Sequence, residues 1–60
     1  MPNYVVWSQE EEDRRGFVES VGHNGIFFTL DIDQAFQFTD EEDAQGVAEM
    51  LEEAVVLEWN

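Results

Sequence analysis

The sequence predicts an α+β fold: three strands, one helix and a final strand in a single open, mostly antiparallel four-stranded sheet, with the helix on one face. Three observations predict this class. β-Branched and aromatic runs lie near both ends of the chain, two stretches with a period of two flank an Asn-Gly pair, and apolar residues recur at helical spacing between residues 40 and 54. At 60 residues, the chain is expected to form one small domain, residues 1–60.

The first predicted strand runs from Tyr4 to Trp7, because its residues are β-branched or aromatic. The segment from Gln9 to Gly16 contains no apolar side chain and is predicted to be a solvated loop.

Two further strands, Phe17 to Val21 and Ile26 to Leu30, are expected to form a hairpin with Asn24 and Gly25 at its tip. This register pairs His23 with Ile26, Val21 with Phe28, and Glu19 with Leu30. One face of the hairpin would then carry Phe17, Val21, Ile26, Phe28 and Leu30, and the other would carry Val18, Ser20, Phe27 and Thr29.

After the hairpin, Asp31 is predicted to cap a short turn that places Ala35, Phe36 or Phe38 under the sheet. Thr39 and Glu42 have the spacing of a capping box, which predicts that the main helix begins here and extends from about Asp40 to Ala54. Its apolar stripe comprises Ala44, Val47, Ala48, Leu51 and Val55, widened by Met50 and Ala54.

Gly46 lies in the middle of this predicted helix, where it costs about 1 kcal/mol relative to alanine. We interpret it as a site of close packing on the sheet. The last strand is predicted from Val55 to Trp59. A right-handed crossover would make it parallel to the first or the third strand; we favour the first, which gives the spatial order 4-1-2-3, with 1-2-3-4 as the alternative.

The charge is extreme: 15 acidic residues against two arginines and no lysine give a formal net charge of −13. Such a chain is repelled by nucleic acid phosphates and by anionic membranes, so its expected partners are basic protein surfaces. Aromatic residues make up 13% of the sequence, which argues against a disordered acidic tail.

Cysteine is absent, no apolar stretch is long enough to span a membrane, and the N-terminus lacks the pattern of a leader peptide. We therefore expect a soluble, cytoplasmic protein.

No catalytic function and no cofactor are predicted. His23 is the sole histidine, in an expected turn with no persuasive nucleophile near it in sequence. Asp31 and Asp33 could join Asp40 or Asp43 as oxygen ligands for calcium, but the spacing lacks the central glycine and terminal bidentate acid of an EF-hand loop. We expect no metal site.

The predicted helix carries one acidic face opposite its apolar stripe, without the basic partners that usually neutralise such a face. Such a row can imitate a nucleic acid backbone. The partner-binding residues predicted on this face are Glu41, Glu42, Glu49, Glu52 and Glu53, extended by the loop residues Glu10, Glu11, Glu12 and Asp13.

Phe27 is a second candidate contact, because it is predicted, with Val18, on the sheet face away from the helix. It supports an alternative function as a structural or adaptor module, or as a homodimer that pairs through this face.

The stretch from Phe28 to Ala44 resembles a pattern in small uncharacterised proteins of bacteriophages and prophages: a strand, a "DIDxA" turn and an "F-T-x-E-E-x-A" helix start. The shared positions are caps and core residues, so no functional residue is transferred. The resemblance implies a phage setting, in which small acidic proteins inhibit host nucleases, polymerases or defence complexes, some by imitating DNA. We therefore predict an acidic inhibitor of a host nucleic-acid-binding protein or defence complex.

Overall fold

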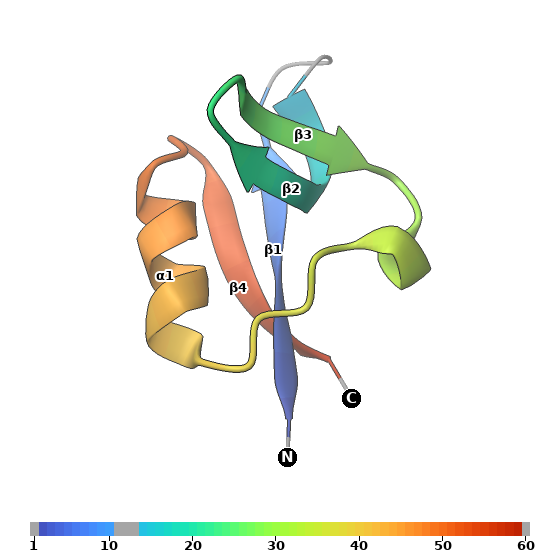
Figure 1. Ribbon diagram of the computed structural model, residues 1–60, viewed down its shortest axis with the longest axis vertical. Coiled ribbons are helices and arrows are strands. Elements are labelled where there is room, and N and C mark those ends of the chain that lie inside the picture. The colour runs from blue at the N-terminus through green and yellow to red at the C-terminus, as the bar shows by residue number, and fades with distance from the viewer. Residues whose placement is uncertain (1, 11–13, 60) are drawn as a thin grey trace.

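A computed structural model describes residues 2–10 and 14–59. Four strands form one sheet in the order β3-β2-β1-β4, with every neighbouring pair antiparallel, and one helix packs on a face of that sheet (Figure 1). The predicted α+β class and the favoured spatial order 4-1-2-3 are confirmed. The elements are β1 (Asn3–Gln9), β2 (Arg15–Gly22), β3 (Gly25–Thr29), the 3₁₀-helix η2 (Ile32–Gln34), α1 (Glu41–Glu49) and β4 (Ala54–Trp59).

The direction of β4 differs from the prediction, because β4 is antiparallel to β1. The reason is that the segment between η2 and α1 runs along the length of the sheet before the helix begins. Tyr4 and Phe38 exchange two backbone hydrogen bonds of 2.8 Å in an antiparallel bridge, so this connection runs back along β1. α1 therefore begins near the end of the sheet where β1 starts, and β4 returns antiparallel to β1 (Figure 1).

The hairpin turn is shifted by one residue from the predicted register. Gly22 pairs with Gly25, so His23 and Asn24 form the turn. Gly25 has a positive φ of 115°, and among residues 2–10 and 14–59 only glycines have a positive φ. Glycine adopts this conformation without the steric cost that a Cβ would bring, which explains why Gly25 directly follows the turn formed by His23 and Asn24.

A β-bulge at Glu19 also changes which side chains face the helix. The register shifts between Val18 and Ser20, so Val18 pairs with Phe28 while Ser20 pairs with Phe27. One extra residue reverses the alternation of faces. Val18, which was predicted to point away from the helix, is therefore fully buried beneath it.

The main core lies between the sheet and α1. Phe17 was expected on this face but lies on the opposite one, where its ring packs edge-on against Trp7 at a centroid distance of 4.8 Å. The buried residues of the core are Val6, Val18, Phe38, Ala44, Ala48 and Leu51.

α1 is shorter than predicted and has a different cap. The backbone N–H of Glu42 donates to the Asp40 carboxylate at 2.9 Å, so Asp40 is the N-cap in place of Thr39. The N–H groups of Met50 and Leu51 bond to carbonyls three residues earlier, which tightens and ends the last turn.

The predicted packing role of Gly46 is wrong: this residue is exposed, and a Cβ built on it would meet no atom within 4 Å. It lies on the solvent side of α1, away from the side of Ala44 and Ala48.

The short turn after β3 follows the prediction. The Asp31 carboxylate accepts a hydrogen bond of 3.0 Å from the Asp33 N–H and caps η2. Ala35 and Phe38 are buried beyond it, whereas Phe36 remains half exposed.

Candidate protein-binding surface

The outer side of α1 is lined by carboxylates. Asp40, Glu41, Glu42 and Asp43 lie at or just before its start and Glu49 at its end, and all are exposed. Glu42 and Glu49 are seven residues apart, so they share a side of the helix at a separation of about 10 Å along its axis. The helix therefore presents negative charge at both ends of its solvent side.

Two of the predicted helical acids do not lie on the helix. Glu52 and Glu53 lie in the turn that joins α1 to β4, because α1 ends at Glu49. The helical row from Glu41 to Glu49 extends about 12 Å, shorter than the about 18 Å expected from a helix that includes Glu53. We use the term acidic surface for Glu41, Glu42, Glu49, Glu52 and Glu53, all of which are exposed.

The start of the acidic loop lies beside the turn that holds Glu52 and Glu53. The N–H of Gln9 donates to the Glu53 carbonyl at 2.7 Å, and the N–H of Glu52 donates to the Glu10 carboxylate at 3.0 Å. The expected link between this loop and the acidic turn is therefore present at Glu10.

Glu10 itself has a structural role. Its second oxygen lies 3.6 Å from the Arg14 guanidinium, and its side chain is only 11% exposed. Both carboxylate oxygens thus have partners inside the molecule, which leaves Glu10 less available to another protein. The other predicted loop residues, Glu11, Glu12 and Asp13, lie outside the described residues.

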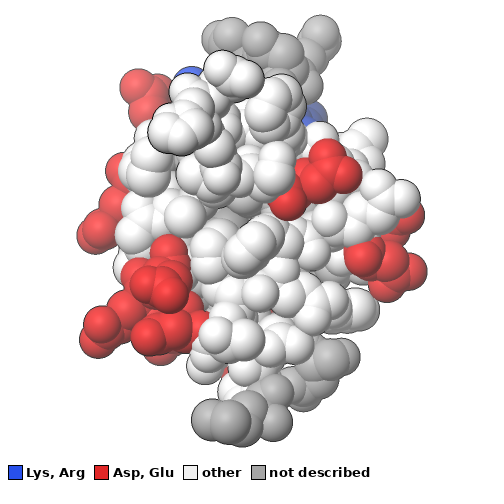
Figure 2. Space-filling model, viewed as in Figure 1, with Lys and Arg blue, Asp and Glu red and all other residues white. Residues whose placement is uncertain are grey.

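The acidic side chains are distributed unevenly. In Figure 2 they gather along the side formed by α1 and on the opposite side near η2, and much of the middle of this face is uncharged. Within residues 2–10 and 14–59, the one ion pair joins Arg14 to Glu10, so no basic side chain in that part of the chain neutralises the acidic surface.

Apolar side chains are exposed on the sheet face away from α1. Phe27 is 53% exposed, and its pairing with Ser20 places it on this face as predicted. Val55 and Leu57 of β4 are 46% and 42% exposed and lie opposite Trp7 and Val5. The alternation of β4 predicted that they share a face, but their exposure depends on the edge position of β4, which the sequence does not reveal.

The structure does not bring the candidate catalytic and metal-binding side chains together. His23 is exposed in the hairpin turn, and Asp31 and Asp40 each cap a different helix. No group of three or more His, Asp or Glu side chains in the described ranges is placed to hold a metal ion. An open hollow adjoins the start of α1, lined by Pro2, Asn3, Tyr4, Thr39, Asp40 and Glu41.

The described residues contain no helix with the length and apolar character needed to cross a bilayer. The fold and the acidic surface together define a small, strongly acidic α+β domain. Comparison of the chain with protein-family models, curated proteins and solved structures finds no match. The resemblance to bacteriophage proteins therefore stays a prediction.

Proposed function

We propose that this protein binds the basic surface of a nucleic-acid-binding protein and blocks it competitively, as an acidic inhibitor of a bacterial host enzyme or defence complex. The observation that carries the proposal is the acidic surface: exposed carboxylates on α1 and the following turn, with no cation of the described chain bound to them. We propose no catalytic activity.

Two physical effects favour such binding. A net charge of −13 attracts a basic protein over a distance and raises the rate of encounter. At contact, arginine side chains of the partner form short, charge-assisted hydrogen bonds with carboxylates.

The dimensions of α1 suit this role. Its acidic row of about 12 Å spans between three and four phosphate steps of a DNA strand, at about 3.4 Å per step. Glu52 and Glu53 continue the negative charge beyond the helix end, where their turn is hydrogen-bonded to Gln9 and Glu10. A helix and a hydrogen-bonded turn fix the backbone that carries these side chains, so no backbone ordering is needed on binding.

A second candidate function is an adaptor or homodimer that uses the apolar sheet face. The half-exposed side chains of Phe27, Val55 and Leu57 favour it. The two functions differ in their response to salt, because a complex held by charge weakens steeply as salt rises, whereas an apolar contact is unchanged or strengthened.

The experiment begins with capture of partners from bacterial lysate and mass spectrometry, followed by binding measurements with the purified partner. Changing Glu41, Glu42, Glu49, Glu52 and Glu53 to glutamine keeps their shape and removes their charge. We expect this variant to lose both binding and the ability to displace nucleic acid from the partner.

A comparison of two variants with the same net charge distinguishes the effect of where the charges lie from the effect of total charge. Glu42→Gln with Glu49→Gln changes two charges of the acidic surface, and Glu19→Gln with Asp33→Asn changes two exposed charges elsewhere. We expect the first pair to weaken binding more than the second. Full binding by the five-glutamine variant would contradict the proposal and favour the apolar sheet face.

A further inference from the structure

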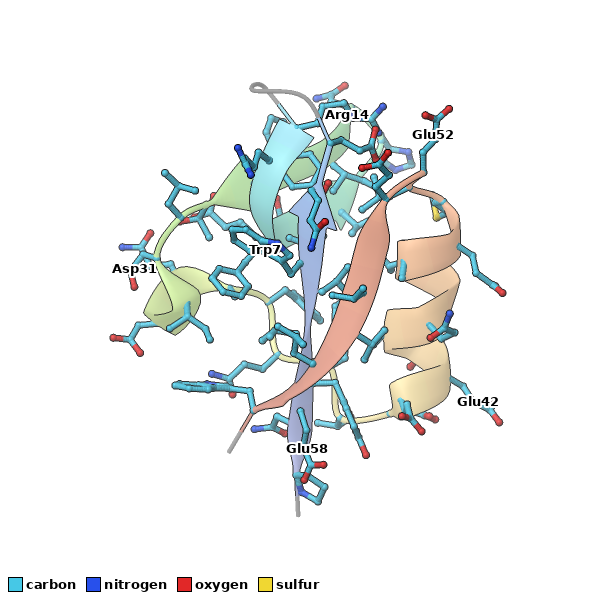
Figure 3. All side chains as sticks on the ribbon, turned by 180° about the vertical axis from the view of Figure 1, so that it is seen from behind. Trp7, Arg14, Asp31, Glu42, Glu52 and Glu58 are labelled. Atoms are coloured by element: carbon cyan, nitrogen blue, oxygen red, sulfur yellow. The ribbon has the colours of Figure 1, made fainter. Side chains whose placement is uncertain are left out.

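β4 is the outermost strand on one side of the sheet. It pairs along its whole length with β1, from Asn3–Trp59 to Ser8–Ala54, and no backbone hydrogen bond from another described segment reaches its outer side. In Figure 3, β4 lies between β1 and α1 in the view and crosses β1 toward its C-terminal end. The strand contains no lysine, proline or bulge, and Glu58 is its single charged residue.

The hydrogen-bond pattern identifies which backbone groups face outward. Gln9 donates to the Glu53 carbonyl at 2.7 Å, and this pair is in register with Trp7–Val55 and Val5–Leu57. Hydrogen-bonded pairs alternate along an antiparallel ladder, so every second residue of β4 bonds to β1. The residues between them direct their N–H and C=O groups to the outer edge: Ala54, Val56 and Glu58.

An apolar row runs beside these outward groups. Val55 and Leu57 are half exposed on the face away from α1, and Trp59 follows them in the same row. A strand added to the edge would bring its own side chains directly beside this row, at every second position. The edge therefore favours an extended segment with alternating apolar residues.

Carboxylates lie near both ends of β4. Figure 3 shows Glu52 just before the start of β4 and Glu58 near its other end, and Glu42 lies farther away, on the outer side of α1. A second copy of the chain would bring another net charge of −13 to this edge, whereas a basic segment would be attracted to it. Charge complementarity thus favours a basic occupant over a homodimer.

We propose that the outer edge of β4 binds an extended segment of the partner as an additional strand, in which apolar residues alternate with lysine or arginine. The backbone of Ala54, Val56 and Glu58 forms the new hydrogen bonds, and the apolar residues cover Val55 and Leu57. The sign of the partner's charge rests on the proposed function, whereas the strand pairing rests on the geometry of β4.

Two peptides test the pairing directly by calorimetric titration of the whole protein. The first, the valine peptide, alternates lysine with valine over the length of β4. The second has the same sequence with every backbone nitrogen methylated, so the charges and side chains are equal but only the first can donate hydrogen bonds to the edge. We expect the valine peptide to bind about a hundredfold more tightly than the methylated peptide, because three hydrogen bonds to the carbonyls of Ala54, Val56 and Glu58 are lost, at about fivefold each.

A matched pair of variants locates the binding at the edge. Glu58→Pro removes an outward N–H group, and Glu58→Gln removes the same charge but keeps that group. Proline is tolerated on an edge strand where its nitrogen faces solvent, and the Glu58 side chain is exposed. Glu58→Pro should bind the valine peptide about fivefold more weakly than Glu58→Gln, the effect of one hydrogen bond.

Amide hydrogen exchange in the unmodified protein gives an independent measurement. On addition of the valine peptide, exchange should slow at Ala54, Val56 and Glu58, with less change at Val55 and Leu57, which are already bonded to β1. This measurement keeps the proposal falsifiable even if Glu58→Pro fails to fold.

Three results would overturn the strand-addition proposal. Equal binding of both peptides would show that the protein recognises the charged peptide without strand pairing. The proposed function would then stand, and the strand-addition proposal would be wrong. Absence of binding by both peptides would exclude the edge, while partner capture and the glutamine variants would still test the acidic surface. Sedimentation of the protein alone as a dimer that dissociates in Glu58→Pro but not in Glu58→Gln would show that a second copy occupies the edge.

Discussion

The Glu10 carboxylate accepts a hydrogen bond from the backbone N–H of Glu52 at 3.0 Å, across 42 positions of sequence. Its other oxygen lies 3.6 Å from the Arg14 guanidinium. One acidic side chain thus joins the end of β1 to the turn before β4, and it lies next to the turn that contains Glu52 and Glu53. The contact favours a rigid arrangement of charge at this end of the molecule.

Removal of this carboxylate should destabilise the fold. We expect Glu10→Ala to lower the free energy of unfolding by about 1 to 2 kcal/mol, because the Glu52 N–H loses its charged acceptor and Arg14 loses its counterion. Glu52→Ala removes the same charge but keeps its backbone N–H, so it serves as the control and should have little effect. Equal losses of stability in urea denaturation would show that the contact contributes nothing.

The core position of Leu51 gives a second prediction. Leu51 is 6% exposed under the sheet, whereas the preceding Met50 is 65% exposed. Leu51→Asp places an unpaired charge in the core and should unfold the domain, while Met50→Asp makes the same chemical change at the surface and should leave it folded. Circular dichroism and thermal melting of the two variants distinguish these outcomes. A folded Leu51→Asp variant would contradict the assignment of the core.

The class of fold could be predicted because it depends on local patterns. The strand order was predicted correctly, but from a crossover that would make β4 parallel to β1, whereas β4 is antiparallel. The β-branched runs around Val6 and Val56 and the apolar spacing of Ala44, Ala48 and Leu51 each indicate one element with one buried side. The cap of η2 at Asp31 was predictable for the same reason, since its hydrogen bond joins residues two positions apart.

The predictions that were wrong concern features that depend on contacts between distant segments of the chain. Nothing local indicates that Phe38 pairs with Tyr4, and this bridge reverses the direction of β4. The bulge at Glu19 is likewise decided by how Val18 packs against the core. For the candidate site, the exposure of the acids was predictable, whereas the end of α1 at Glu49 and the internal partners of Glu10 were not.

Two glycines should respond to alanine with opposite signs. Gly16 has φ 128°, and a Cβ on it would lie 2.7 Å from the Thr29 carbonyl oxygen, so Gly16→Ala requires the backbone to shift. We expect it to cost about 2 kcal/mol or more. Gly46 lies in the middle of α1 with open space around it, so Gly46→Ala should stabilise the domain by about 0.5 to 1 kcal/mol.

Both glycine variants are to be measured by urea denaturation against the unmodified protein. Destabilisation by Gly46→Ala would show that α1 requires glycine at this position for a reason other than space.

Salt should stabilise this protein, because its excess of negative charge opposes the compact state. Raising sodium chloride from about 0.01 M to about 1 M shortens the Debye length from about 30 Å to about 3 Å and screens most of the repulsion between exposed carboxylates. We therefore expect the melting temperature to rise steadily with salt.

The variant with glutamine at all five positions of the acidic surface provides the control, since it has less repulsion to screen. Its melting temperature should be higher at low salt and should rise less steeply. Equal slopes for the two proteins would mean that salt acts through general exclusion from the protein surface, and that the carboxylates of the acidic surface do not repel one another enough to affect folding.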